Sequence, residues 1–304
     1  MIFGICPPLF LAAGLLTQNP VNGVGDGFDW TAPPGLAALA EKLAPDLASE
    51  FSEAQSWTGL PRQNEPFKVL WVANKAELAE ALGKPVPEWF AAVAIPAERR
   101  LVIATQTAGS IGSLHRTIRH ELMHLAMADL GPEAFERVPA WFHEGCAELF
   151  GGEVLLAKQG SNLAWSAAAR NLPSLASFAQ AFPEDSLAAA EGYALSHAFV
   201  ERVVRIYGLI VVREVLAAVH AGASFEEAFV EATGVSTVTV EEELRQELAG
   251  LAGILGDWQL QIFLGIAVFI FFIFPILRAS RRKRRKELEL RWAQEDDGFL
   301  EEDA

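Results

Sequence analysis

The chain has 304 residues, 51% of them hydrophobic, and a mean hydropathy of +0.23, enough for one sizeable soluble domain together with an apolar segment. Residues 1–257 hold 16 basic against 31 acidic side chains, so the net charge of −15 lies in this part, and we expect no nucleic-acid partner for it. The two cysteines, Cys6 and Cys146, lie far apart in the sequence and offer no disulfide framework.

The chain begins with an apolar stretch, MIFGICPPLFLAAGLL, whose length suits the core of a signal peptide better than a membrane span. We interpret residues 1–23 as a signal-peptide-like segment. This segment lacks a basic start and a clear A-x-A site, so the sequence leaves its cleavage open. The Gly-, Pro- and Asn-rich stretch 19–35 follows, and we expect residues 24–35 to form a linker.

The next part of the chain shows both helical and strand patterns. Apolar residues at helical spacing predict a helix over 36–57, and a short apolar run predicts a strand over 67–73. Residues 75–83 are typical of a short helix that ends at a glycine. Two apolar runs, 89–96 and 100–105, are separated by a short polar turn, which indicates a hairpin.

A polar loop, QTAGSIGS, leads into a region in which residues 112–250 indicate helices with short joints. A small antiparallel sheet followed by a helical C-terminal half is an α+β plan. We therefore expect residues 36–250 to fold as one α+β domain.

Residues 258–277 contain no charged side chain, and twenty helical residues rise about 30 Å, the thickness of a bilayer core. A buried core helix is the alternative for this stretch. The segment 278–286 that follows carries seven basic residues and no acid, which predicts a cytoplasmic end by the positive-inside rule. We therefore expect a single-pass cell-membrane protein in which residues 24–257 lie outside the cytoplasm and a basic-then-acidic tail, 278–304, lies inside.

The stretch TIRHELMHLAMAD contains the pattern H-E-x-x-H. His120 and His124 are one helical turn apart, so both side chains project from one face and can bind one metal ion. Glu121 lies beside them, as the general base does in zinc peptidases. A helix with two hydrogen-bonded histidines and no metal is the alternative.

A catalytic zinc needs a third protein ligand. The stretch VPAWFHEGCAELFGG places Glu144 and Glu148 four residues apart on a second helix, so they share a face. If the two helices pack side by side, Glu144 can complete the site, and Glu148 can accept a hydrogen bond from a ligating histidine. Four of the six histidines fall between residues 115 and 143, which favours a site.

These two motifs, HELMH and WFHEGCAELF, resemble those of the gluzincin metallopeptidases, and most closely those of bacterial peptidase MA-like domains. The resemblance covers residues 36–250. It implies that His120, His124 and Glu144 are ligands of one Zn²⁺ per chain, that Glu121 is the general base, and that the substrate is a peptide or protein.

Three assignments stay open in the sequence. Tyr193 and His197, four apart on one helical face, are both candidates for the donor that stabilises the oxyanion, and ordinary helix packing is the alternative for each. His143 stands directly before Glu144 and is an alternative ligand. Cys146 is better interpreted as a small residue packed between two helices.

In related enzymes the substrate lies extended along an edge strand above the metal. Our candidate for that strand consists of Phe90, Ala91, Ala92, Val93, Ala94 and Ile95. The sequence thus predicts a membrane-anchored zinc metallopeptidase. Two rival interpretations are an inactive, membrane-tethered binding module of the same fold and an adaptor that acts through its cytoplasmic tail.

Overall fold

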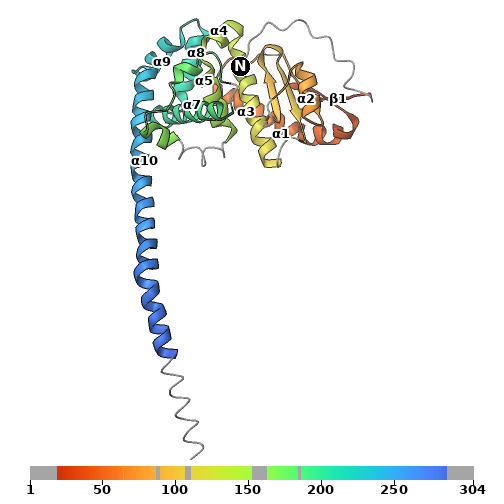
Figure 1. Ribbon diagram of the computed structural model, residues 1–304. Coiled ribbons are helices and arrows are strands. Elements are labelled where there is room, and N and C mark those ends of the chain that lie inside the picture. Colours follow the sequence, from red (N-terminus) through yellow and green to blue (C-terminus); the bar gives the residue numbers. More distant parts are fainter. Residues whose placement is uncertain are drawn as a thin grey trace, which may run out of the picture. The chain divides into compact units, whose positions relative to one another are not determined.

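A computed structural model describes residues 19–63, 65–86, 90–106, 111–152, 163–183 and 186–285 (Figure 1). The chain divides into two compact units, Met1–Ala249 and Gly250–Ala304. The core of the predicted signal-peptide-like segment and the acidic end of the predicted tail lie outside the described residues. The first unit is a mixed α+β fold with a helical second half, as predicted.

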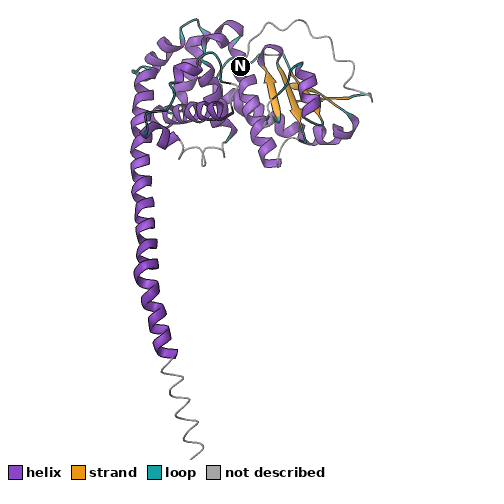
Figure 2. Ribbon diagram, viewed as in Figure 1, coloured by secondary structure: helices purple, strands orange, loops and turns teal. Residues whose placement is uncertain are grey.

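The first unit begins with a sheet and two of its helices: β1 (Val21–Gly25), β2 (Phe28–Ala32), α1 (Pro34–Thr58), β3 (Phe67–Val72), α2 (Lys75–Leu82), β4 (Ala92–Ile95) and β5 (Arg100–Ala104). Helices follow: α3 (Ile111–Met127), η2 (Ala128–Leu130), α4 (Pro132–Arg137), α5 (Ala140–Gly151), η3 (Leu175–Phe178), α7 (Ser186–Tyr207), α8 (Leu209–His220) and α9 (Phe225–Thr233). Helix α10 (Thr237–Val268) begins in the first unit and continues into the second. Figure 2 shows this change from strands to helices.

The sheet is mixed, so the prediction of an antiparallel sheet is wrong in part. Its strand order is β1-β2-β3-β5-β4; the two outer pairs are antiparallel, whereas β3 runs parallel to both β2 and β5. Helix α1 joins β2 to β3, and such a crossover brings the chain back in the same direction. The hairpin that the two apolar runs indicated is the pair β4–β5.

Residues 24–35 are not a linker, because β1 and β2 form a hairpin that pairs Val21 with Ala32 and Gly25 with Phe28. Gly27 has a φ of 82°, which permits the tight turn between the strands. Phe28 and Trp30 of β2 are buried, so every second residue of β2 enters the core. Residues 21–23 of the predicted signal-like segment also belong to this hairpin.

The two faces of the sheet are covered by different helices. On one face, alternate residues such as Val69, Trp71 and Leu101 join the main core, into which α1 and α3 pack. On the other face, Val72 and Val102 form a smaller cluster with α2. This alternation follows from the two-residue period of a strand. The main core extends from the sheet into the helical half and so positions α3 between the two parts.

In the second unit, α10 is followed by a π-helical turn, Phe269–Ile273, and the chain stays helical to residue 285. Among the described residues, one helix, Gln261–Arg285, is long and apolar enough to cross a membrane, with a mean hydropathy of 2.5 over its best window. Large apolar side chains such as Phe263 and Phe271 are exposed along it. The predicted span 258–277 overlaps this helix.

Candidate metal centre

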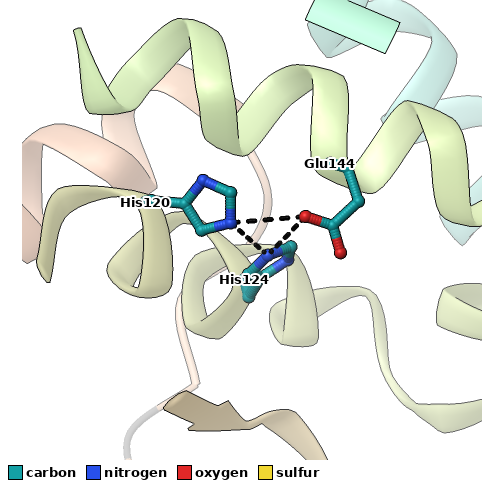
Figure 3. Close-up of side chains that lie close together, drawn as sticks. All are labelled: His120, His124 and Glu144. Atoms are coloured by element: carbon teal, nitrogen blue, oxygen red, sulfur yellow. Dashed lines mark hydrogen bonds and ion pairs between the residues drawn. The ribbon is translucent and has the colours of Figure 1, made fainter. Parts of the chain in front are cut away.

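Helix α3 carries the H-E-x-x-H pattern between the sheet and the helical half. Leu122, Met123 and Leu125 are fully buried, so they anchor α3 in the core. With these residues fixed inward, His120 and His124 both face α5, one turn apart along the helix (Figure 3). The position of the two imidazoles is therefore set by core packing rather than by a loop.

Helix α5 lies close to two neighbouring helices because two of its positions are glycines. A Cβ atom added to Gly145 would stand 2.5 Å from the carbonyl oxygen of Ser196 in α7. A Cβ atom added to Gly151 would stand 3.3 Å from the carbonyl oxygen of Arg116 in α3. Only glycine at position 145 permits α5 and α7 to pack this closely. Glu144 is the residue directly before Gly145.

Three predicted ligands meet between α3 and α5. The Nε2 atoms of His120 and His124 are 3.2 Å apart, and Oε2 of Glu144 lies 3.3 Å from the first and 3.4 Å from the second (Figure 3). In a tetrahedral zinc site with bonds of about 2.0–2.1 Å, any two ligand atoms stand about 3.3–3.4 Å apart. The three donor atoms therefore have the spacing of three corners of such a site, and all three fit a zinc ion.

The charges of this cluster are strongly coupled. Burial lowers the pKa of His120, but the hydrogen bond to Glu144 and the charges of Glu148 and Glu121 outweigh burial and raise this pKa to about 10. Burial raises the pKa of Glu144, but the two histidines outweigh burial and hold this pKa well below its ordinary value. Without a metal, His120 and Glu144 thus form an ion pair at neutral pH.

Glu148 lies where a supporting hydrogen-bond acceptor was predicted. Its Oε1 is 3.4 Å from Nδ1 of His120, the ring nitrogen that faces away from the cluster. Such a contact fixes the tautomer and the orientation of an imidazole that uses Nε2 as a ligand. Among the described residues, Nδ1 of His124 has no hydrogen-bond partner. Of the two imidazoles, only that of His120 is therefore held by an acceptor at its second ring nitrogen.

The side chain of Glu121 points to strand β4 rather than into the cluster. Its Oε2 accepts a 2.6 Å hydrogen bond from the backbone N–H of Ala94. Burial raises the pKa of Glu121, although the charges of His120 and His124 and the bond from Ala94 oppose this rise. A carboxylate that is partly desolvated and held beside the cluster suits proton transfer.

Strand β4 is an edge strand, and its register shows which backbone groups face outward. The N–H of Ala104 donates to the carbonyl of Ala91, so this pair is hydrogen-bonded, and the alternate residues Ala92 and Ala94 turn their backbone groups away from β5. The predicted edge strand 90–95 is correct for Ala92–Ile95, whereas Phe90 and Ala91 precede the strand because the chain bends there.

Of the two predicted oxyanion donors, Tyr193 is electrostatically coupled to the cluster. The nearby charge of Glu144, then burial, then Glu121 and Glu148 raise its pKa far above its ordinary value, so the phenol stays protonated and can donate. For His197, burial lowers the pKa to about 4, and its Nδ1 lies 4.0 Å from Oε2 of Glu201. Of the two residues, Tyr193 is thus the one whose pKa is shifted by the carboxylates of the cluster.

The alternative ligand His143 makes a different contact. Its Nε2 lies 3.0 Å from the carbonyl oxygen of Phe135, and its ring packs against the Phe135 ring. Burial lowers the pKa of His143 to about 4, so the ring is neutral at pH 7. Cys146 is fully buried, and burial raises its thiol pKa well above the ordinary value, in keeping with a packing residue.

Sequence reasoning missed two contributors to this site. The N–H of Ala94 is one, and nothing in the sequence marks it, because every residue except proline has such a group. Gly145 is the other, and here a signal exists: a glycine inside a helix costs about 1 kcal/mol relative to alanine, which implies a close packing contact.

The match with a known family agrees with this geometry. A family model described as the Peptidase MA superfamily matches residues 53–250, more than half of the chain. The match spans both helices of the cluster and the edge strand. No curated protein matches the chain.

Proposed function

Because the chain belongs to the peptidase MA superfamily, we propose that it is a membrane-anchored, zinc-dependent peptidase of the gluzincin type, whose ligands are His120, His124 and Glu144. The observation that carries this proposal is the spacing of 3.2–3.4 Å between the three donor atoms. Two neutral imidazoles and one carboxylate would leave a net charge of +1 on the zinc ion.

A zinc ion held there would lower the pKa of a water molecule to about 7 and polarise the scissile carbonyl. Glu121 is the general base: its carboxylate accepts the proton of the attacking water and then gives it to the leaving amine. The Ala94 N–H keeps this carboxylate at the edge of β4, next to the cluster. Tyr193 donates to the developing oxyanion.

The substrate binds as an added strand along β4. The N–H and carbonyl of Ala92 and the carbonyl of Ala94 face away from β5, and an extended peptide pairs with these groups, whereas the N–H of Ala94 stays with Glu121. Such main-chain hydrogen bonds give affinity without sequence specificity. Because Glu121 accepts the N–H of Ala94, an incoming peptide places its backbone next to the general base.

The membrane anchor is the helix Gln261–Arg285, whose apolar part is followed by basic residues. Exposed phenylalanines along this helix are costly in water and favourable in lipid. The positive-inside rule supports a cytoplasmic C-terminal end, so the catalytic unit lies outside the cytoplasm.

The test is zinc content together with hydrolysis of a mixed, unstructured protein by the detergent-solubilised full chain. We expect about one zinc per chain, and Glu121→Gln should abolish hydrolysis while the zinc stays, because Glu121 is a base and not a ligand. Glu133→Gln, at an exposed position of α4, is the matched control and should keep full activity. Near-full activity of Glu121→Gln would refute the mechanism. Zinc binding without hydrolysis by the wild type would support the inactive binding module.

A further inference from the structure

The turn of the β4–β5 hairpin carries a buried arginine. Arg99 lies between the short helix η1 (Pro96–Glu98) and β5, and its backbone has a φ of 47° and a ψ of 48°. These angles are left-handed, a region that favours glycine and that arginine rarely adopts. The side chain of Arg99 is only 10% exposed. An arginine in an unfavourable backbone conformation, with its charge turned inward, indicates a specific contact inside the fold.

That contact is Asp129 of η2, the helical turn that follows α3. Nη1 of Arg99 donates a 2.7 Å hydrogen bond to Oδ1 of Asp129, whose side chain is 1% exposed. The other carboxylate oxygen, Oδ2, accepts a 3.1 Å hydrogen bond from Nε2 of Gln55 in α1. Nη1 of Arg99 also donates to Oε1 of Gln63 at 3.3 Å. Asp129 thus connects the hairpin with α1 and with the end of α3.

The hairpin is therefore attached to the H-E-x-x-H helix at two points. One is the hydrogen bond from Ala94, in β4, to Glu121. The other is the Arg99–Asp129 ion pair at the turn of the hairpin, about two helical turns further along α3 and η2. A single point would let the hairpin pivot, whereas two points fix both its distance from α3 and its direction along it. Glu121 also has to transfer a proton in the proposed reaction, but the ion pair takes no part in the chemistry.

The energetics of a buried ion pair favour a role in geometry. Removing two charges from water is costly, and their attraction does little more than offset that cost, so such a pair adds little net stability. A charged hydrogen bond between a guanidinium and a carboxylate is directional, however, so it holds the two groups in a defined arrangement. The ion pair is thus suited to fixing where the hairpin lies rather than to stabilising the fold.

We propose that Arg99 and Asp129 are positioning residues of the peptidase, whose ion pair holds β4 where an added substrate strand passes the general base. The inference rests on the proposed function and extends it, because it makes peptide binding depend on two residues outside the metal cluster. Neither residue is one of the proposed ligands, so zinc affinity should not depend on them.

Backbone hydrogen exchange of the zinc-loaded, detergent-solubilised full chain tests this attachment without any hydrolysis. Asp129→Asn keeps the shape of the side chain but leaves the guanidinium without a counter-charge, so Arg99 turns to solvent. We expect the amides of β4 to exchange about tenfold faster, and those of α5 to stay within about twofold of wild type. Arg99→Lys should stay within about threefold, because a single nitrogen makes the contact with Asp129 and lysine can supply it.

The matched control is Glu98→Gln. Glu98 forms an ion pair with Arg100 at 3.1 Å, within the hairpin itself. Losing this exposed pair should leave β4 exchange and peptide affinity within about twofold of wild type, because surface pairs contribute little.

Steady-state hydrolysis of an unstructured fluorogenic peptide separates positioning from stability. For Asp129→Asn we expect KM to rise about tenfold and kcat to fall at most about threefold, because the strand that binds the peptide is displaced. Zinc content should be unchanged. A variant that is only less stable has fewer active chains, which lowers the apparent kcat and leaves KM as it is.

The double variant Arg99→Met with Asp129→Leu keeps the proposal testable if Asp129→Asn does not fold. It removes both charges together and leaves no buried charge unpaired, so it should fold and show the same losses. Exchange of β4 and a KM that both stay within about twofold of wild type in this variant overturn the proposal. Equally faster exchange in β4 and α5, with an unchanged KM, also overturns it. Faster β4 exchange in a chain whose wild type hydrolyses nothing supports the attachment and rejects the peptidase function.

Discussion

At the scale of single residues, the adjacent pair His143 and Glu144 provides the test of the proposed ligand assignment. Their side chains diverge by about 100° around the axis of α5, so only one faces α3. Glu144 lies within 3.4 Å of both Nε2 atoms, whereas His143 contacts the carbonyl of Phe135. We expect Glu144→Ala to lose zinc and activity together, and His143→Ala to keep the metal and lose activity at most in part.

Zinc content by mass spectrometry or a chromogenic chelator checks this pair. His143→Ala also removes a buried ring, so its folding is verified by thermal unfolding before the metal is counted. Glu148→Ala should lie between the two, with zinc affinity reduced by roughly ten- to a hundredfold, because His120 loses its supporting acceptor. If His143→Ala removes the zinc and Glu144→Ala retains it, the ligand assignment is wrong.

The raised pKa of His120 predicts proton release on zinc binding. With a pKa of about 10, this imidazole is protonated at pH 7 in the metal-free protein, and a ligand must be neutral. Zinc therefore displaces about one proton from His120, and apparent zinc affinity should rise by roughly tenfold per pH unit between pH 7 and 9. Calorimetry in buffers of different ionisation enthalpy counts the proton. A zinc affinity that stays flat over this range contradicts the ion pair described here.

The clustered donors were predictable from sequence because four-residue spacing on a helix is a local property. His120 and His124 lie on one face of α3 whatever the position of that helix in the fold, and Glu144 and Glu148 likewise lie on one face of α5. That α3 and α5 face each other is a property of the tertiary structure. The resemblance of the motifs implied this packing, but the spacing of the residues alone does not predict it. The hydrogen bond from the N–H of Ala94 to Glu121 depends on the register of the β4–β5 hairpin. No side chain in the sequence indicates that register.

At the scale of secondary structure elements, the crossing of α5 and α7 depends on Gly145. Alanine there would place a Cβ atom 2.5 Å from the backbone of Ser196 and 2.6 Å from a methyl group of Val200. Because a backbone atom is involved, one helix must shift, and Glu144 shifts with it. We expect Gly145→Ala to lower the free energy of unfolding by about 1–3 kcal/mol, more than the helix propensity of alanine returns, and to weaken zinc binding.

Denaturant unfolding and zinc titration of the same variant check this prediction. The matched control is Gly35→Ala in α1, where an added Cβ atom meets open space and should not destabilise the protein. A Gly145→Ala variant as stable as wild type, with unchanged zinc affinity, would mean that the crossing tolerates a side chain and does not position Glu144.

The errors in the predicted elements have a common physical cause. Residues 24–35 are rich in glycine and proline, which are typical of linkers, yet the alternation of Phe28, Trp30 and Ala32 places three side chains in the core. Strand direction was missed for a related reason, because whether two strands run parallel depends on the path of α1 between them and not on either strand's residues. The helices were predicted well because their apolar spacing is local.

At the scale of the whole molecule, we infer the membrane topology from the charges beside the apolar helix. Seven basic residues follow its apolar part directly, whereas the unit before it is acidic. We expect a reporter that is active only outside the cytoplasm to be active when fused before Asp257 and silent when fused after Arg291. A second reporter that is active only in the cytoplasm should give the opposite pattern, and the reverse result for both would place the catalytic unit inside the cell.

The hydrogen bond between Ala94 and Glu121 has a further consequence, for self-association. An edge strand with free backbone donors is a template on which another chain can add a strand, and such pairing is a route to aggregation. In this protein a carboxylate occupies the N–H of Ala94 on β4, so another copy would have to displace a charged group to pair there. The same side chain that is proposed to activate water thus also removes one donor from the edge on which a second sheet could pair.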